Sequence, residues 1–129
     1  MTVGDQLNTS LRLLASDTFD SECPTRPIMD KVTSRWGTLI VAALVTEPHR
    51  FSALHRRIGG ISQKMLSQHL KALVSSGLVI RNVEPTVPPQ VTYSLTELGM
   101  SLAGPLTDLL GWFGRNRAEL LAAQQQTAD

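Results

Sequence analysis

The hydrophobic pattern of this sequence changes from a helical to an extended period at Gly77, and this change limits the fold more than any other feature. Before Gly77, apolar residues recur at helical spacing, which predicts an amphipathic helix. After it, residues 78–83 and 91–95 have extended character, and the second run alternates apolar with polar residues. Residues 84–90 between the runs contain three prolines, so we expect a loop there. The sequence therefore predicts a helix followed directly by a two-stranded β-hairpin.

The helix that ends at Gly77 has clear signals at both ends. Ser62 is a good N-cap because its hydroxyl can accept a hydrogen bond from a free amide of the first turn. Ile61 can pack on Leu66 as a hydrophobic staple, and Gly77 is placed as the C′ residue of the helix. At about 100° per residue, the face that we expect to be buried carries Leu66, Leu70, Leu73 and Val74.

Three more helices are predicted upstream. Pro24 and Pro27 favour the start of the first, Pro48 ends the second, and Gly59-Gly60 end the short third. Their predicted buried stripes are Ile28 and Val32, then Trp36, Leu39, Ile40, Ala43 and Leu44, then Phe51, Leu54 and Ile58. The third helix and the helix after Ser62, joined by a glycine turn, have the layout of a helix-turn-helix.

A long helix is predicted after the hairpin, with Thr96 as its cap and a bend at Gly104-Pro105. Its apolar stripe is larger than a small domain needs to cover, so we expect a second chain to cover the rest. That stripe contains Leu98, Leu102, Leu106, Leu109, Leu110, Trp112, Phe113, Leu120 and Leu121.

The predicted fold class is mainly α with a small β-hairpin (α+β): a winged helix-turn-helix with added N- and C-terminal dimerisation helices. We expect an N-terminal arm at residues 1–22, flexible in part or docked on a second subunit, with an apolar cluster at Leu7, Leu11, Leu13 and Leu14. The winged helix-turn-helix domain should span 23–95, the dimerisation helix 96–125, and a disordered tail 126–129.

The length of 129 residues suits a single compact domain. The longest apolar stretch, 39–45, is too short to span a bilayer, and the first residues lack the pattern of a secretory signal. A single cysteine cannot form an internal disulfide. We therefore expect a cytoplasmic protein with no membrane partner.

Positive charge is concentrated in one part of the chain, although the net charge is only +1. Residues 48–83 contain no Asp or Glu but hold half of the 12 basic residues. Such segregation creates a local positive field and is typical of a surface that meets phosphate. A solvated surface with a chance bias in charge is the alternative interpretation.

Several short segments occur here in a specific order. They are Cys23-Pro24, Arg35-Trp36 with Thr38-Leu39-Ile40, Arg50-Phe51-Ser52-x-Leu54, Gly60-Ile61-Ser62-Gln63-Lys64-Met65-Leu66-Ser67-Gln68-x-Leu70, Gly77-Leu78-Val79 and Val87-Pro88-Pro89-x-Val91-x-Tyr93-Ser94-Leu95-Thr96-x-Leu98-Gly99. Each is weak alone. Together they span most of the chain, and with them the sequence resembles the HxlR-type family of winged-helix regulators.

The resemblance implies a transcription factor that acts on a nearby operon and forms a homodimer through its N- and C-terminal helices. Two departures stand out. Gln90 occupies a position where many relatives have arginine. The predicted hairpin at residues 78–95, which is the wing of this fold, should therefore hold the minor groove of DNA less firmly. The arm before Cys23 is also longer than in many relatives.

A double-stranded DNA operator is therefore the expected partner. The N-terminal residues of a recognition helix reach base edges, and the candidates for base contacts are Gln63, Lys64, Ser67 and Gln68. Candidates for contacts to phosphate are Arg50, Arg56, Arg57, Ser62 and Lys71, and Arg81 and Gln90 should belong to the wing. The alternative for Gln63 and Ser67 is that they are ordinary polar residues in solvent, and the alternative for Arg56 and Arg57 is that they keep the helix soluble.

Cys23 is a candidate redox sensor. It precedes a predicted helix N-terminus, where the helix dipole favours the reactive thiolate, and Arg26 is near in sequence. Several HxlR-type regulators sense oxidants, quinones or other electrophiles through a cysteine near the first helix, so the resemblance implies the same here. The alternative is a small buried thiol that only packs.

Other classes of function have little support in the sequence. His49, His55 and His69 lack the spacing of a helical metal pair, and the chain has neither a Cys-x-x-Cys motif nor a glycine-rich phosphate loop. We therefore expect no enzyme, no metal and no cofactor. A ligand- or metal-responsive regulator with a structural Cys23, or a winged helix used only for protein contacts, stays open.

Overall fold

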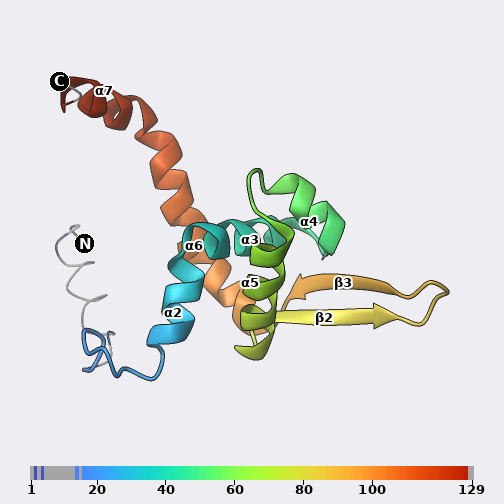
Figure 1. Ribbon diagram of the computed structural model, residues 1–129. Coiled ribbons are helices and arrows are strands. Elements are labelled where there is room, and N and C mark those ends of the chain that lie inside the picture. The colour runs from blue at the N-terminus through green and yellow to red at the C-terminus, as the bar shows by residue number, and fades with distance from the viewer. Residues whose placement is uncertain (1, 3, 5–13, 15, 128–129) are drawn as a thin grey trace.

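The computed structural model describes residues 2, 4, 14 and 16–127. In chain order the elements are α2 (Arg26–Thr33), α3 (Arg35–Thr46), β1 (His49–Arg50), α4 (Phe51–Arg57), α5 (Gln63–Ser75), β2 (Val79–Glu84), β3 (Gln90–Leu95), α6 (Glu97–Arg115) and α7 (Arg117–Thr127). Helices form a body from which the β2–β3 hairpin projects, and α7 lies at the opposite end (Figure 1). The predicted fold class, a mainly α winged helix-turn-helix with a small hairpin, is confirmed.

The hairpin belongs to a three-stranded antiparallel sheet with the order β1-β3-β2. Strands β2 and β3 pair from Val79 opposite Leu95 to Glu84 opposite Gln90. Strand β1 adds His49 opposite Tyr93 on the other side of β3. Strand β1 was not predicted, because a two-residue strand is too short to show a period.

Serine and threonine caps begin three of the helices, as the sequence predicted for two of them. The Oγ atom of Ser62 accepts from the amide of Met65 at 3.0 Å, and Oγ1 of Thr96 accepts from the amide of Gly99 at 3.0 Å. Ser34 caps α3 in the same way. The predicted starts of α5 and α6 are therefore confirmed.

Gly77 ends α5 in the left-handed region, with φ of +76°. Its amide donates to the carbonyl of Val74 at 3.1 Å, and the amide of Leu78 donates to the carbonyl of Leu73 at 3.1 Å. These two bonds form a Schellman motif. The hydroxyl of Thr96 donates to the carbonyl of Gly77 at 2.6 Å. One turn therefore joins the end of α5, the start of β2 and the start of α6.

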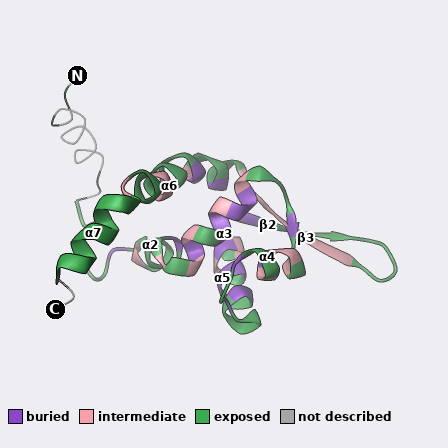
Figure 2. Cartoon of the chain, turned by 90° about the horizontal axis from the view of Figure 1, so that it is seen from above, coloured by how far each residue is buried: buried purple, intermediate pink, exposed green. Residues whose placement is uncertain are grey.

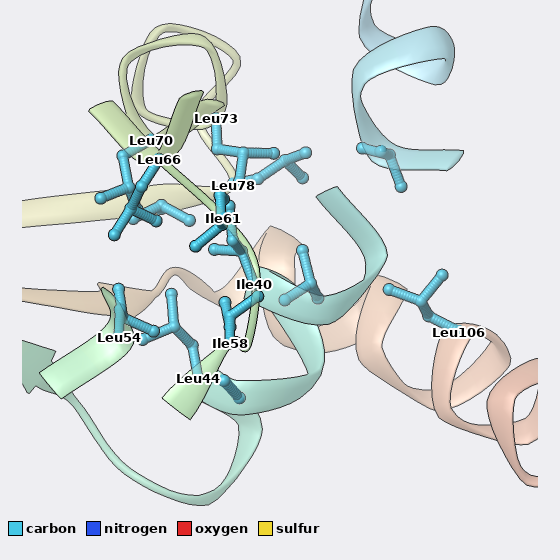
Figure 3. Packing of buried hydrophobic residues seen from close by; sticks show 14 residues of the cluster. Ile40, Leu44, Leu54, Ile58, Ile61, Leu66, Leu70, Leu73, Leu78 and Leu106 are labelled. Atoms are coloured by element: carbon cyan, nitrogen blue, oxygen red, sulfur yellow. The ribbon is translucent and has the colours of Figure 1, made fainter. Parts of the chain in front are cut away.

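The core is a single cluster of buried side chains from α2, α3, α4, α5, α6 and the start of the sheet (Figure 3). Leu66, Leu70 and Leu73 of α5 point into it, and Ile61 just before the helix is also buried. Three details of the predicted faces are wrong. Ile28 of α2, predicted to be buried, is 39% exposed. Leu39 is 38% exposed and Val41 is fully buried, since α3 packs on several elements rather than along one stripe. Val74 is only half-buried, at the edge of the core.

The C-terminal region contains two helices rather than the single helix predicted for 96–125. The break is at Asn116, whose amide and side-chain Nδ2 both donate to the carbonyl of Trp112, at 3.0 and 2.9 Å. This doubled capping ends α6, whereas Pro105 lies inside α6 and does not end it. Helix α7 runs to Thr127, two residues beyond the predicted limit.

The predicted N-terminal arm and tail fall partly outside the described residues, and residues 126–127, predicted to belong to a disordered tail, are part of α7. Residues 128–129 of the tail and the leucines at 7, 11 and 13 are not described, and Leu14 is 45% exposed. Figure 2 shows the buried residues gathered where α3, α5 and the base of the hairpin meet, while α7 and the hairpin tip are exposed.

Candidate nucleic-acid interface

Helix α5 presents a polar row to solvent. Gln63, Lys64, Ser67 and Gln68 are all exposed, as is Lys71 one turn further on. The opposite face is buried and carries Leu66, His69, Leu70 and Leu73. The orientation predicted for the candidate base-contacting residues is therefore the one observed.

Ser62 is exposed at the N-terminus of this row. Its side-chain oxygen already accepts from the amide of Met65, so the hydroxyl serves as the helix cap. The positive end of the α5 dipole remains at this edge and favours an anion.

His69 is a residue that sequence analysis did not assign. It is 3% exposed; its Nδ1 lies 3.0 Å from the carbonyl of Met65, and its Nε2 lies 3.2 Å from the hydroxyl of Ser34, the cap of α3. The ring therefore joins α5 to the α2–α3 junction. The signal for this role was its position among the leucines: it lies three residues after Leu66 and four before Leu73.

The hairpin stands beside the C-terminal half of α5, and a cleft of about 460 Å³ opens between them. On the hairpin side, Arg81 of β2 lies directly opposite Tyr93 of β3. On the helix side, the cleft includes Lys71 and Ser67 from the exposed row. The structure therefore brings Arg81, assigned to the wing, together with residues of the recognition helix.

Gln90 lies at the far end of the hairpin, opposite Glu84. The loop that follows Glu84 has no basic residue, and Val87 at its tip is fully exposed. The wing therefore carries its only cation, Arg81, towards its base, and its tip lacks the charge that would attract phosphate.

Arg50 and Arg56 are exposed, at the start and near the end of α4. Arg57 differs from them because its Nη1 is engaged within the fold. It donates to the carbonyl of Ala43 at 3.2 Å, to Oγ1 of Thr46 at 3.4 Å and to Nε2 of His49 at 2.9 Å. Only a phosphate contact was predicted for Arg57, because a hydrogen bond between residues eight or more positions apart leaves no local pattern in the sequence.

Cys23 lies two residues before the N-cap of α2 and is 5% exposed. Its thiol donates to Oδ1 of Asp17 at 3.6 Å, and its sulfur lies 3.3 Å from Oγ1 of Thr25. Arg26, expected to assist a thiolate, instead donates from Nη2 to the carbonyls of Thr18 and Asp20. The sulfur is therefore covered, and its polar neighbours are Asp17 and Thr25.

Across residues 16–127 no three His, Cys, Asp or Glu side chains are grouped as a metal site requires. Nor does any helix there have the length and apolar character needed to cross a membrane.

Comparison with known proteins gives consistent matches. The family model described as HxlR-like helix-turn-helix matches residues 31–120. The uncharacterized HTH-type transcriptional regulator YtfH of Escherichia coli (strain K12) is 44% identical to this chain over 123 residues, which make up 95% of this chain and 98% of YtfH.

Solved structures share the fold. The YtfH structure from Salmonella typhimurium has 45% sequence identity and a TM-score of 0.78, and the match covers 83% of this chain and 96% of that one. The redox regulator HypR in its reduced form has 31% identity and a TM-score of 0.70, over 77% of this chain and 98% of HypR. Sequence and fold agree over most of the chain. The chain therefore belongs to the HxlR-like helix-turn-helix family of transcriptional regulators.

Proposed function

We propose that this regulator binds a two-fold symmetric operator as a homodimer, with α5 of each subunit in the major groove. The observation that carries this proposal is the exposed polar row of α5, which lies within a stretch of 36 residues, 48–83, free of Asp and Glu. Such a surface attracts phosphate without repelling it anywhere along the helix. A winged helix used only for protein contacts would not need this segregation.

Within the interface the side chains have two kinds of role. Gln63, Lys64, Ser67 and Gln68 read base edges, since glutamine pairs with adenine and lysine with guanine. Phosphates are held at both sides of the helix and by the wing, which fixes the register of the protein on the duplex. The residues with this second role are Arg50, Arg56, Arg57, Ser62, Lys71, Arg81 and Gln90.

The homodimer forms through the C-terminal helices, together with the N-terminal arm. Exposed apolar side chains occur on both α6 and α7, among them Phe113 at 52% and Leu121 at 47%. Trp112 and Phe113 contact each other edge to face, with ring centroids 5.1 Å apart. An apolar surface of this kind is typical of an interface, and α7 lies at the end of the molecule away from the hairpin (Figure 1). Two-fold pairing there leaves both α5 helices free for two half-sites.

The test uses a fluorescein-labelled duplex from the region upstream of the protein's own gene and a random duplex of equal length. Anisotropy isotherms at several KCl concentrations should give tighter binding to the upstream duplex and a steep salt dependence for both. Analytical ultracentrifugation should show two subunits on each bound duplex. Equal, salt-insensitive affinity for the two duplexes would rule out sequence-specific DNA binding and favour the protein-contact alternative.

We also propose that modification of Cys23 by an oxidant, quinone or other electrophile switches operator binding. The similarity to the redox regulator HypR supports this. With one cysteine per chain, the available products are an alkylated thiol, a mixed disulfide or a disulfide between subunits. A second candidate function is a regulator that responds to another ligand or to a metal, in which Cys23 is only a structural thiol. The burial of Cys23 beside Asp17 favours this alternative.

The two candidates differ in how Cys23→Ser behaves. Operator binding of the wild type and of this variant is measured before and after treatment with diamide and with a benzoquinone. If Cys23 is the sensor, only the wild type loses binding, and mass spectrometry finds the modification on Cys23. Equal responses of the two proteins would remove Cys23 as the sensor, and metal analysis of the gently purified protein would then test the metal-responsive alternative.

A further inference from the structure

The cleft between α5 and the hairpin is built from residues of three elements. Ser67, Lys71 and Ser75 follow one another at four-residue spacing, so they form a single row on α5. Arg81 and Tyr93 face this row from the hairpin, where they are directly opposed across β2 and β3. Adjacent strands hold opposed residues close together. The whole lining is Ser67, Lys71, Val74, Ser75, Arg81 and Tyr93.

The chemistry of this lining suits an oxyanion. Neither Lys71 nor Arg81 forms an ion pair within the described residues, and no acidic side chain lines the cleft. The phenol of Tyr93 likewise has no hydrogen-bond partner in that part of the chain, so its O–H is available as a donor. Ser75 is excluded as a donor because its hydroxyl already donates to the carbonyl of Ala72 at 2.9 Å. Two cations and a phenol favour an anion over a metal ion or an apolar ligand.

The position of the cleft identifies which anion it meets. Ser67 and Lys71 belong both to the cleft and to the exposed row of α5. When α5 lies in the major groove, the DNA backbone that borders the groove passes on the hairpin side of the helix. Each phosphodiester of that backbone carries one negative charge and two free oxygens.

We propose that one backbone phosphate of the operator binds in this cleft and is shared by Lys71, Arg81 and Tyr93. This inference rests on the proposed DNA binding and deepens it. The ammonium and guanidinium groups neutralise the same charge, and the phenol donates to one phosphate oxygen. A shared phosphate ties the recognition helix to the base of the wing, and it compensates for the lack of a cation at the wing tip around Gln90.

Sharing has a measurable consequence for salt dependence. The slope of log K against log salt falls by about 0.9 for each phosphate that a protein ceases to neutralise. If Lys71 and Arg81 hold one phosphate, removal of both charges should lower the slope by about 0.9. If they hold separate phosphates, the same double change should lower it by about 1.8.

The experiment compares Lys71→Gln, Arg81→Gln and the double variant, with the upstream duplex as the probe at several KCl concentrations. We expect the double variant to lose less affinity than the product of the fold-losses of the two single variants, because residues that share a contact depart from additivity. The double variant Lys64→Gln/Arg81→Gln is the matched control. Its two residues are proposed to contact the DNA separately, so the fold-losses of the single variants should multiply. Lys31→Gln on α2 controls for loss of one charge outside the interface. Multiplying losses in Lys71→Gln/Arg81→Gln, with a slope change of about 1.8, would overturn the proposal.

Tyr93→Phe adds a second readout that does not depend on charge. Because it removes one donor to an anion and keeps the ring, it should weaken operator binding about three- to ten-fold in the wild type. In the Lys71→Gln/Arg81→Gln background it should have no effect, since the phosphate is no longer held there. An equal loss in both backgrounds overturns the shared contact. Thermal melting of every variant confirms that the fold is intact.

A last experiment distinguishes binding of a DNA phosphate from binding of a free phosphate ion. Inorganic phosphate is titrated into the ¹⁵N-labelled wild type without DNA, and the amide signals of Lys71, Arg81 and Tyr93 are followed. Little change below millimolar phosphate, together with coupled losses on the duplex, supports the backbone phosphate. Saturable shifts without any effect of the substitutions on duplex binding would assign the cleft to a free anion and overturn the proposal. A wild type that binds no duplex would instead refute the proposed function itself.

Discussion

The Nη1 nitrogen of Arg57 donates a hydrogen bond to Nε2 of His49 over 2.9 Å. Because Nε2 accepts this bond, the ring hydrogen is on Nδ1, which lies 2.8 Å from the carbonyl of Glu47 and donates to it. The same Arg57 nitrogen also donates to the carbonyl of Ala43 and to Thr46 near the end of α3. The last residue of α4 is thereby tied to strand β1 and to the C-terminal turn of α3.

Arg57→Ala should consequently lower both stability and DNA affinity. Loss of these bonds leaves the buried His49 without its partner, and we expect the free energy of unfolding to fall by about 1–2 kcal/mol. Arg56→Ala is the matched control, because Arg56 is its exposed neighbour, and it should change stability by less than about 0.5 kcal/mol. Urea denaturation measures the free energy of unfolding of the two variants. Equal stability of the two variants would contradict the structural role of Arg57.

Gly99 allows α6 to approach the turn after α5. A Cβ atom added there would collide with the carbonyl oxygen and carbon of Leu78, which are backbone atoms and cannot turn aside. Gly99→Ala should therefore destabilise the protein by about 1–3 kcal/mol. Gly104→Ala in the same helix meets no atom within 4 Å, and it should stabilise the helix by about 0.5–1 kcal/mol. Thermal melting of the two variants should show shifts of opposite sign.

Ser62 combines a cap with a place in the interface, and two substitutions can separate these roles. Ser62→Ala removes the acceptor of the Met65 amide and should cost about 1 kcal/mol of stability. Ser62→Asp keeps a capping oxygen, so stability should be retained, but its negative charge should repel the DNA backbone. Parallel measurement of melting temperature and duplex affinity tests both. Tight duplex binding by Ser62→Asp would place Ser62 away from the DNA.

Gln68 is exposed in the middle of the α5 row and should discriminate among bases. A bidentate contact from glutamine to adenine contributes about 1–3 kcal/mol against the wrong base. Gln68→Ala should reduce the preference for the upstream duplex over single-base variants by that amount, with little effect on the random duplex. A uniform loss on all duplexes would indicate a phosphate contact instead.

The sequence was sufficient for elements whose signals are local. The cap at Ser62, the left-handed Gly77 and the change of period after it are each encoded within a few residues, so α5, its outward face and the hairpin were predicted correctly. Contacts between distant segments have no such local code. The pairing of β1 with β3, the bonds from Arg57 to α3 and the bond between His69 and Ser34 all depend on tertiary packing.

The same distinction applies to the candidate site. Helical spacing placed Lys71 and Ser67 on one face, but it could not show that Arg81 and Tyr93 line the same cleft. That meeting depends on the strand register and on how the hairpin leaves α5. Likewise, the sequence placed Cys23 before a helix, whereas its burial beside Asp17 follows from the preceding turn.

Phe113 provides the last prediction, on assembly. Its side chain is 52% exposed on α6 and lies against Trp112. If the C-terminal helices form the dimer interface, Phe113→Glu should bury an unpaired charge there and shift the protein to monomers, as measured by sedimentation velocity. Affinity for a two-fold operator should fall steeply, while affinity for a single half-site should change little. Val87→Glu is the control: Val87 is fully exposed at the hairpin tip, so this variant should remain dimeric and lose only the DNA affinity that a negative charge near phosphate removes. A dimeric Phe113→Glu would show that the interface lies elsewhere.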